Sequence, residues 1–255
     1  MRWLWLDLRA RARERTAWLA AGVLVYAVLA LPVLLAAPPP HVLEALRGWF
    51  GSDQGFVLFL YLWTDVAMNK IVGLLAVVFA GQTLVRERDT GQLDLLRARP
   101  VTLARLFLVR AGSAMAWMAC LYAGTVAVAL PWFALRVEGF RPGVFLLSSL
   151  VHGFAALFAV AAAATLSVVI GRRTLGLVVS LVVLMSLIGA SFMGFYAPEL
   201  AWIAQLDPFA QGVSVVGHLA DLRPRHVVAP IATLSVTIAA TLAVGALAAR
   251  RWEDA

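Results

Sequence analysis

Several long stretches of this sequence carry almost no charged residues, and this feature constrains the fold more than any other. Hydrophobic residues make up 62% of the 255 residues and charged residues only 14%, so a soluble domain could not bury all of its apolar surface. The apolar stretches reach about 20 residues, the length of a helix that crosses a hydrocarbon core of about 30 Å. They lack the alternating pattern of β-barrel strands. We therefore expect an all-α integral membrane protein.

The charge-poor stretches predict six membrane-spanning helices in a single membrane domain, because no soluble domain fits between them. The expected spans cover residues 17–37, 56–85, 108–135, 143–170, 176–195 and 227–249. The first apolar stretch is longer than the core of a cleaved signal peptide, which favours a retained span. Apolar residues of segment 1–16 share one helical face, so we expect an interfacial helix there, with a frayed basic tail as the alternative.

The distribution of basic residues predicts the orientation of the chain. The net charge is +7, and most of the 21 lysine and arginine residues lie on one side of the expected spans. Basic residues are enriched in cytosolic loops, so both termini are expected in the cytosol of a multi-pass plasma-membrane protein, and the charge requires no nucleic-acid partner. The residues concerned are Arg2, Arg9, Arg11, Arg13, Arg15, Arg86, Arg88, Arg97, Arg99, Arg105, Arg110, Arg172, Arg173, Arg250 and Arg251.

The cytosolic segment of residues 86–105, between the expected second and third spans, is amphipathic. Gly91 permits a helix to end, and Pro100 breaks the apolar run that follows. Thr102 can cap the helix that becomes the third span. Leucines alternate here with residues of both charge signs, namely Leu93, Asp94, Leu95, Leu96, Arg97 and Arg99. A solvated loop whose leucines face lipid is the alternative interpretation.

This segment resembles a motif in the permeases of type-two ATP-binding-cassette (ABC) exporters. The family pattern is Glu, two or three residues, Gly-Thr-Leu-Glu-Leu-Leu, a short gap, then Pro-Val-Ser-Arg. The matching residues are Glu87, Gly91, Leu93, Leu95, Leu96, Pro100 and Val101. The chain departs from the pattern at Gln92, Asp94, Thr102 and Leu103. The resemblance extends over the whole chain, from the interfacial helix through six spans to a proline-containing outer segment.

The resemblance implies that this segment is a coupling helix that docks a separate ATPase. The implied docking residues are Glu87, Gly91, Leu93, Leu95, Leu96, Arg97, Arg99, Pro100 and Val101. The sequence has no GxxxxGK[ST] phosphate loop, so ATP is expected to bind to the partner. The family assembly implies two ATPase copies, a second permease copy or a homologue, and room for an extracytoplasmic accessory protein. No cofactor and no catalytic role are expected in this chain.

Four polar residues within the expected spans are candidates for an outer gate or substrate contact. They are Asp65, Asn69, Lys70 and His152. Asp65 and Asn69 would share one face of an α-helix, and charges at such depth are costly unless they pair or reach the interface. The alternatives are an interfacial anchor beside Tyr61 and Trp63, and a neutral histidine that is hydrogen-bonded to a neighbouring helix.

Other protein classes have weaker support in the sequence. A stand-alone ion-coupled carrier is the main alternative, but it would need carboxylates at mid-membrane, and Asp65 lies too shallow. A GxSx match at Ser191 has no histidine base in the last span, which argues against a rhomboid-like protease. Met115, Met118 and Cys120 are more typical of helix packing than of copper binding. For residues 196–226, short interfacial helices and a surface loop are both open.

Overall fold

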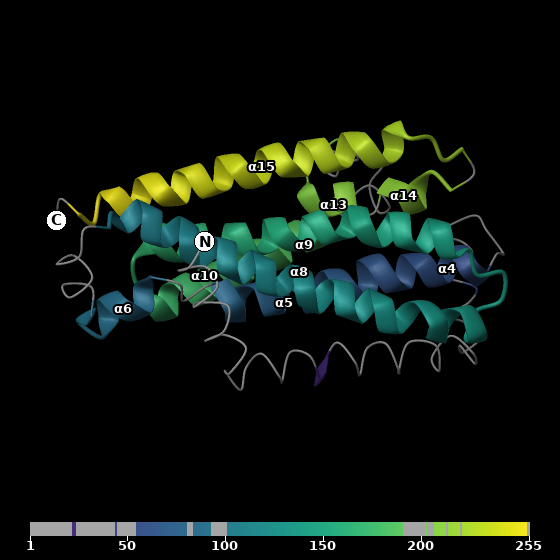
Figure 1. The fold of residues 1–255 in the computed structure, drawn as a ribbon, viewed down its shortest axis with the longest axis horizontal. Coiled ribbons are helices and arrows are strands. Elements are labelled where there is room, and N and C mark those ends of the chain that lie inside the picture. Colours follow the sequence, from purple (N-terminus) through teal and green to yellow (C-terminus); the bar gives the residue numbers. More distant parts are fainter. Residues whose placement is uncertain are drawn as a thin grey trace.

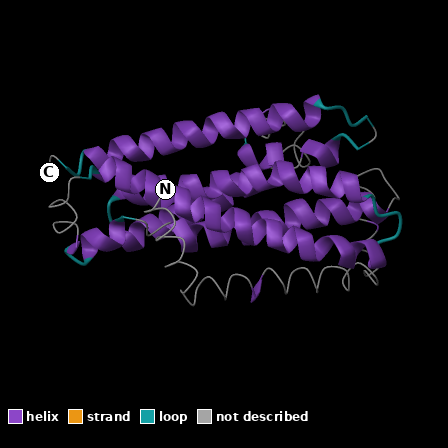
Figure 2. Cartoon of the chain, viewed as in Figure 1, coloured by secondary structure: helices purple, strands orange, loops and turns teal. Residues whose placement is uncertain are grey.

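The computed structural model describes residues 22–23, 44, 55–80, 84–92, 101–190, 202, 207–212, 214–219 and 221–253, with the backbone alone at residues 55, 65 and 66. Within these ranges every regular element is helical. The long helices lie side by side along one axis of an elongated bundle (Figures 1 and 2). The expectation of an all-α fold is confirmed.

Within the part of the chain that the structure describes, five helical stretches are long and apolar enough to cross a membrane. The first is a continuous run of α4 (Gly55–Tyr61), η1 (Leu62–Met68) and α5 (Asn69–Ala80), and the others are α8 (Leu103–Arg136), α9 (Pro142–Ile170), α10 (Arg173–Ala190) and α15 (Arg225–Arg250). They correspond to five of the six expected spans. The remaining expected span, residues 17–37, and the interfacial segment 1–16 lie outside the described residues, apart from the helical pair Gly22 and Val23.

Helix α9 occupies the centre of the bundle. It contacts α5, α8, α10, α13 (Pro208–Gly212) and α15. In its most apolar stretch 67% of the residues are buried, compared with 17% in α15. The buried alanines at 161–164 allow neighbouring helices to approach closely, and beside them Thr165 Oγ1 donates a hydrogen bond to the Thr241 carbonyl of α15 at 3.0 Å.

The start of α8 agrees with the cap predicted at Thr102. The helix begins at Leu103, and the Thr102 hydroxyl caps it by accepting a hydrogen bond from the Arg105 amide at 3.3 Å. The cap expected at Thr102 is confirmed. The helix therefore extends beyond the apolar stretch 108–135 that was expected to cross the membrane, into the basic residues before it.

The middle of the expected second span is not a regular α-helix. Leu62–Met68 forms a π-helix between α4 and α5. Its i→i+5 hydrogen bonds lower the rotation per residue compared with an α-helix, but residues four apart still lie close to one face, so the expected placement of Asp65 and Asn69 on one face stays a prediction. π-Helical turns of this kind often accompany functional sites.

The segment before α15 contains short helices. The described residues of this segment include α13 and α14 (Ser214–Gly217), and both contact α9. At the start of α13 the Asp207 Oδ1 atom accepts a hydrogen bond from the Phe209 amide at 2.9 Å, and the Phe209 side chain is fully buried. Of the two interpretations left open for residues 196–226, the described part therefore supports short helices.

Candidate functional site

Helix α6 (Val85–Asp89) carries two side chains that fasten it to other parts of the chain. The first is Glu87, whose Oε1 atom forms an ion pair with Arg110 Nη2 of α8 at 2.6 Å. The side chain of Glu87 is 10% exposed and that of Arg110 is 30% exposed. A charge-assisted contact of this length in a partly buried place fixes α6 against the first turns of α8. Glu87, expected to orient the rim of a docking surface, is engaged within its own chain.

The second side chain is Arg88, which reaches the turn between α9 and α10. Its Nη1 atom donates a hydrogen bond to the Gly171 carbonyl at 3.4 Å, and its guanidinium lies 4.7 Å from the centroid of the Trp252 ring. Gly171 has a φ of +69°, and an added Cβ would lie 2.6 Å from Arg88 Nη1. Only glycine satisfies both the backbone conformation and the close approach of Arg88.

The residues that follow α15 complete this end of the bundle. Glu253 Oε1 accepts a hydrogen bond from the backbone amide of Leu103, the first residue of α8. Figure 1 shows α6 at the same end of the bundle as the last turns of α15. Four segments are therefore tied together here: α6, the start of α8, the α9–α10 turn and the residues after α15. We call this set of contacts the α6 junction.

The expected docking segment starts at the α6 junction. Helix α6 ends at Asp89, and Gly91 follows with a φ of +70°, so the helix exit expected at Gly91 is confirmed. Val101 lies in the non-helical stretch just before α8. The other expected docking residues lie outside the described part of the structure: Leu93, Leu95, Leu96, Arg97, Arg99 and Pro100. Their docking role stays a prediction.

An open cavity of about 460 Å³ adjoins the α6 junction. Asp89 at the end of α6 lines one side, and the first residues of α10 line the other. The wall contains both charge signs and apolar groups, since Arg172, Arg173, Leu175 and Val178 all contribute. A surface with this mixture is suited to binding a protein segment that has an apolar anchor and a charged rim.

A second candidate site is a buried polar cluster that joins three helices. His152 of α9 accepts a hydrogen bond at Nδ1 from the Tyr122 hydroxyl of α8 at 2.9 Å, and its Nε2 atom lies 2.5 Å from Asn69 Oδ1 of α5. An amide oxygen is an acceptor, so Nε2 carries the proton in this assignment. A neutral imidazole supplies one donor and one acceptor and satisfies both contacts. The expected contact of His152 with neighbouring helices is confirmed, and its neutral state stays a prediction.

The four expected gate residues differ in their surroundings. Asn69 and His152 are fully buried and in contact, whereas Lys70 is exposed. The side chain of Asp65 lies outside the described part of the chain. The sequence-based prediction missed Tyr122, although a tyrosine in the middle of an apolar helix usually needs a hydrogen-bond partner for its hydroxyl. This need for a hydrogen-bond partner was the signal in the sequence that could have identified Tyr122.

Aromatic side chains gather at the end of the bundle opposite the α6 junction. Phe133 lies edge-on to Phe59, with ring centroids 4.6 Å apart, and to Trp63, with centroids 5.0 Å apart. Phe145 joins them at 5.7 Å from Phe133. Trp63 is fully buried among these rings. We call Phe56, Phe59, Trp63, Phe133, Phe140 and Phe145 the aromatic cluster.

The described residues offer no evident metal site. No group of three or more histidine, cysteine, aspartate or glutamate side chains is placed to hold a metal within those ranges. Cys120 is exposed and Met118 is buried, so these sulfur atoms do not converge on one copper site. Ser191, the residue of the protease alternative, lies outside the described part of the chain.

No protein-family model matches this chain, and no curated protein matches it significantly.

Proposed function

We propose that this chain is the membrane-spanning permease subunit of an ATP-driven ABC exporter. In this proposal the chain has six spans, both termini lie in the cytosol of a plasma-membrane protein, and ATP binds to a separate subunit. Two ATPase copies would act on two permeases, which are copies of this chain or this chain and a homologue, and an extracytoplasmic accessory protein can be added. The chain would catalyse no reaction and hold no cofactor of its own.

The observation that carries the proposal is the attachment of the motif-bearing segment to the rest of the bundle. A segment that receives force from an ATPase must be connected firmly to the helices that it moves. Residues 93–100 lie between α6, which is fixed by Glu87 and Arg88, and α8, whose first residue is bonded to Glu253. Displacement of the segment would therefore act on α8, on the α9–α10 turn and on the residues after α15 together.

The cavity beside α6 supports a docking surface at this position. Leu95 and Leu96 would provide the apolar anchors, with Arg97 and Arg99 at the rim. The cavity wall at Asp89, Arg172 and Arg173 would extend the rim on the permease side. Buried apolar anchors usually contribute most of the binding energy of such interfaces, and exposed rim charges contribute less.

The buried polar cluster lies further along the bundle, away from the α6 junction. Asn69, His152 and Tyr122 join α5, α9 and α8, so a change at the α6 junction that rotates α8 would alter these hydrogen bonds. We assign the Asn69–His152 pair a gating role and place Asp65 near the outer gate. Lys70, which is exposed, would anchor the helix in the interface rather than contact substrate.

The test is co-purification of the ATPase subunit with docking-segment variants. Leu95→Asp and Leu96→Asp should each reduce recovery of the ATPase and ATP hydrolysis, by roughly tenfold or more, because a charge would enter an apolar groove. Arg99→Ala should have a smaller effect. The matched control is Leu222→Asp, which places the same change in the loop before α15, at the other end of that helix.

Two results would refute parts of the proposal. Full ATPase recovery with both leucine variants would refute the docking role of the segment. Transport by the purified chain in vesicles without any ATPase would refute the exporter assignment and favour the ion-coupled carrier.

A further inference from the structure

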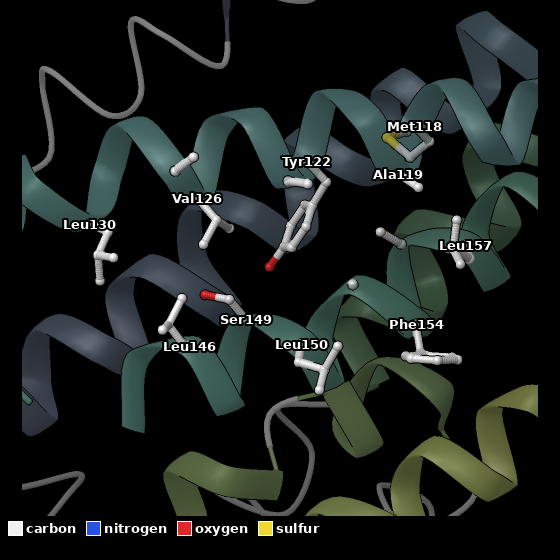
Figure 3. Close-up of a pocket in the computed structure, with 14 residues that line it drawn as sticks. Met118, Ala119, Tyr122, Val126, Leu130, Leu146, Ser149, Leu150, Phe154 and Leu157 are labelled. Atoms are coloured by element: carbon white, nitrogen blue, oxygen red, sulfur yellow. The ribbon is translucent and has the colours of Figure 1, made fainter. Parts of the chain in front are cut away.

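A groove between α8 and α9 opens sideways from the bundle and has a volume of about 480 Å³ (Figure 3). One wall is a row of small residues on α8 at intervals of four, Ala119, Ala123 and Ala127, all of them exposed. The other wall is formed by larger apolar side chains of α9, including Leu146, Leu150 and Phe154. The alanines leave space that larger side chains would have filled, so the two helices do not close on each other here.

Two hydroxyl groups interrupt the apolar lining. Tyr122 and Ser149 face each other across the groove in Figure 3, and they lie close enough to interact. Tyr122 already donates its hydrogen to His152. Ser149 is only 2% exposed, and its Oγ atom has no hydrogen bond of normal geometry among the described residues. A buried hydroxyl without a proper partner is unfavourable, so a polar group supplied from outside would stabilise it.

We propose that this groove binds an uncharged amphipathic molecule from the membrane. Its apolar chain would lie between α8 and α9, and its hydroxyl or ester carbonyl would form a hydrogen bond with Ser149. The site is independent of the exporter assignment, since it is built from α8 and α9 alone.

Three properties of the groove select this ligand class. Both walls belong to helices long and apolar enough to cross a membrane, so the groove would lie at the depth of the lipid chains. The described residues that line the groove include no charged side chain, and an ionic head group would lose its hydration without gaining a partner. The volume lies within the range of about 300–1,000 Å³ that is typical of ligand pockets.

The experiment is photo-labelling of the full-length chain in lipid nanodiscs. Two probes of equal chain length carry a diazirine at mid-chain, and one ends in a hydroxyl whereas the other is an alkane. We expect the alcohol probe to label peptides of α8 and α9 that line the groove more strongly than the alkane does. Ser149→Ala should lower alcohol labelling there by about fivefold, the effect of one net hydrogen bond, and leave alkane labelling unchanged. Ser148→Ala is the matched control, because Ser148 is also buried but does not line the groove.

A second pair of variants tests the groove itself. Ala123→Leu should fill the space and remove labelling by both probes, whereas Ala134→Leu, an exposed position of α8 outside the groove, should not. Equal labelling by both probes with no effect of Ser149→Ala would overturn the proposal, because it indicates ordinary lipid contact. Labelling that survives Ala123→Leu would overturn it as well. Absence of groove labelling in the folded wild-type chain, as when other residues or a second copy cover the site, would also refute it.

Discussion

The two ends of the helix bundle are held together by different chemistry. At the α6 junction the contacts join charged and backbone groups, such as Glu87 with Arg110 and Arg88 with Gly171. At the opposite end the aromatic cluster packs Phe59, Trp63 and Phe133 edge to face. Helix α8 contributes to both ends and, at 34 residues, separates them by about 50 Å.

The difference indicates which end of the bundle can rearrange. Interlocked aromatic rings have few alternative arrangements, because a shift of any one ring opens a void. The contacts at the α6 junction are separate ion pairs and hydrogen bonds, so polar groups of another protein can replace them one at a time without opening a void. We therefore expect the aromatic cluster to act as a fixed joint and the α6 junction to be the end at which a partner changes the structure.

The largest effect should come from Phe133, which touches Phe59, Trp63 and Phe145. Phe133→Ala should lower the free energy of unfolding by about 3–5 kcal/mol, because it removes a fully buried ring and leaves a cavity. Unfolding in mixed detergent micelles measures the change. Leu135→Ala, at a side chain that is 81% exposed on the same helix, should alter stability by less than about 0.5 kcal/mol. Equal losses for both variants would show that the cluster is not a stabilising joint.

A double-mutant cycle on Glu87 and Arg110 should give the next largest effect. The single variants Glu87→Gln and Arg110→Gln and the double variant should yield a coupling energy of about 1–2 kcal/mol, since the carboxylate is mostly buried. The same unfolding assay applies. A coupling energy near zero would mean that this ion pair does not fasten α6 to α8.

A smaller change is expected from Arg88→Lys. Lysine keeps the positive charge but lacks the planar guanidinium that lies over the Trp252 ring, so stability should fall by about 0.5–1 kcal/mol. Trp252 fluorescence offers a direct readout, and its emission should shift as the ring becomes more hydrated. The variant Trp252→Phe, with Arg88 retained, gives the fluorescence of the other tryptophans for comparison. An emission spectrum that Arg88→Lys leaves unchanged would contradict the stacking role.

The smallest effect should come from the exposed pair of Asp221 and Arg223, before α15. Asp221→Asn removes an ion pair of 2.9 Å whose side chains are 63% and 56% exposed. Such pairs contribute about 0.2–1 kcal/mol and are screened by salt. We expect a loss at the low end of this range in dilute buffer and none at high salt, measured by unfolding in both. A loss of stability that persists at high salt would show that this ion pair contributes more than is usual for exposed side chains.

The sequence was sufficient to predict the helical fold and the approximate positions of the described spans. The length of each apolar stretch decides both, and that length can be counted directly along the sequence. The cap at Thr102 and the helix exit at Gly91 were also predictable, because each depends on a few adjacent residues.

Contacts between residues far apart in the chain could not be predicted from the sequence. The ion pair of Glu87 with Arg110 and the contact of Arg88 with Trp252 depend on how helices are rotated about their axes. The contact of Asn69 with His152 depends also on the π-helix, which changes that rotation and leaves no clear mark in the residues. Local patterns indicated that His152 would have a partner but not which one.

The central position of α9 has a consequence for the order in which the chain is assembled during synthesis. Helices α5 and α8 precede α9 in the sequence, so the aromatic cluster and the contacts of His152 can form once Ile170 has been made. Trp252 and Glu253 follow all of the described long helices, so their contacts with Arg88 and Leu103 form last. Nascent proteins fold from the N-terminus onward. We expect that a chain stalled before residue 252 would hold a packed aromatic cluster and an unfinished α6 junction, a state that quality-control proteases can distinguish from the completed protein.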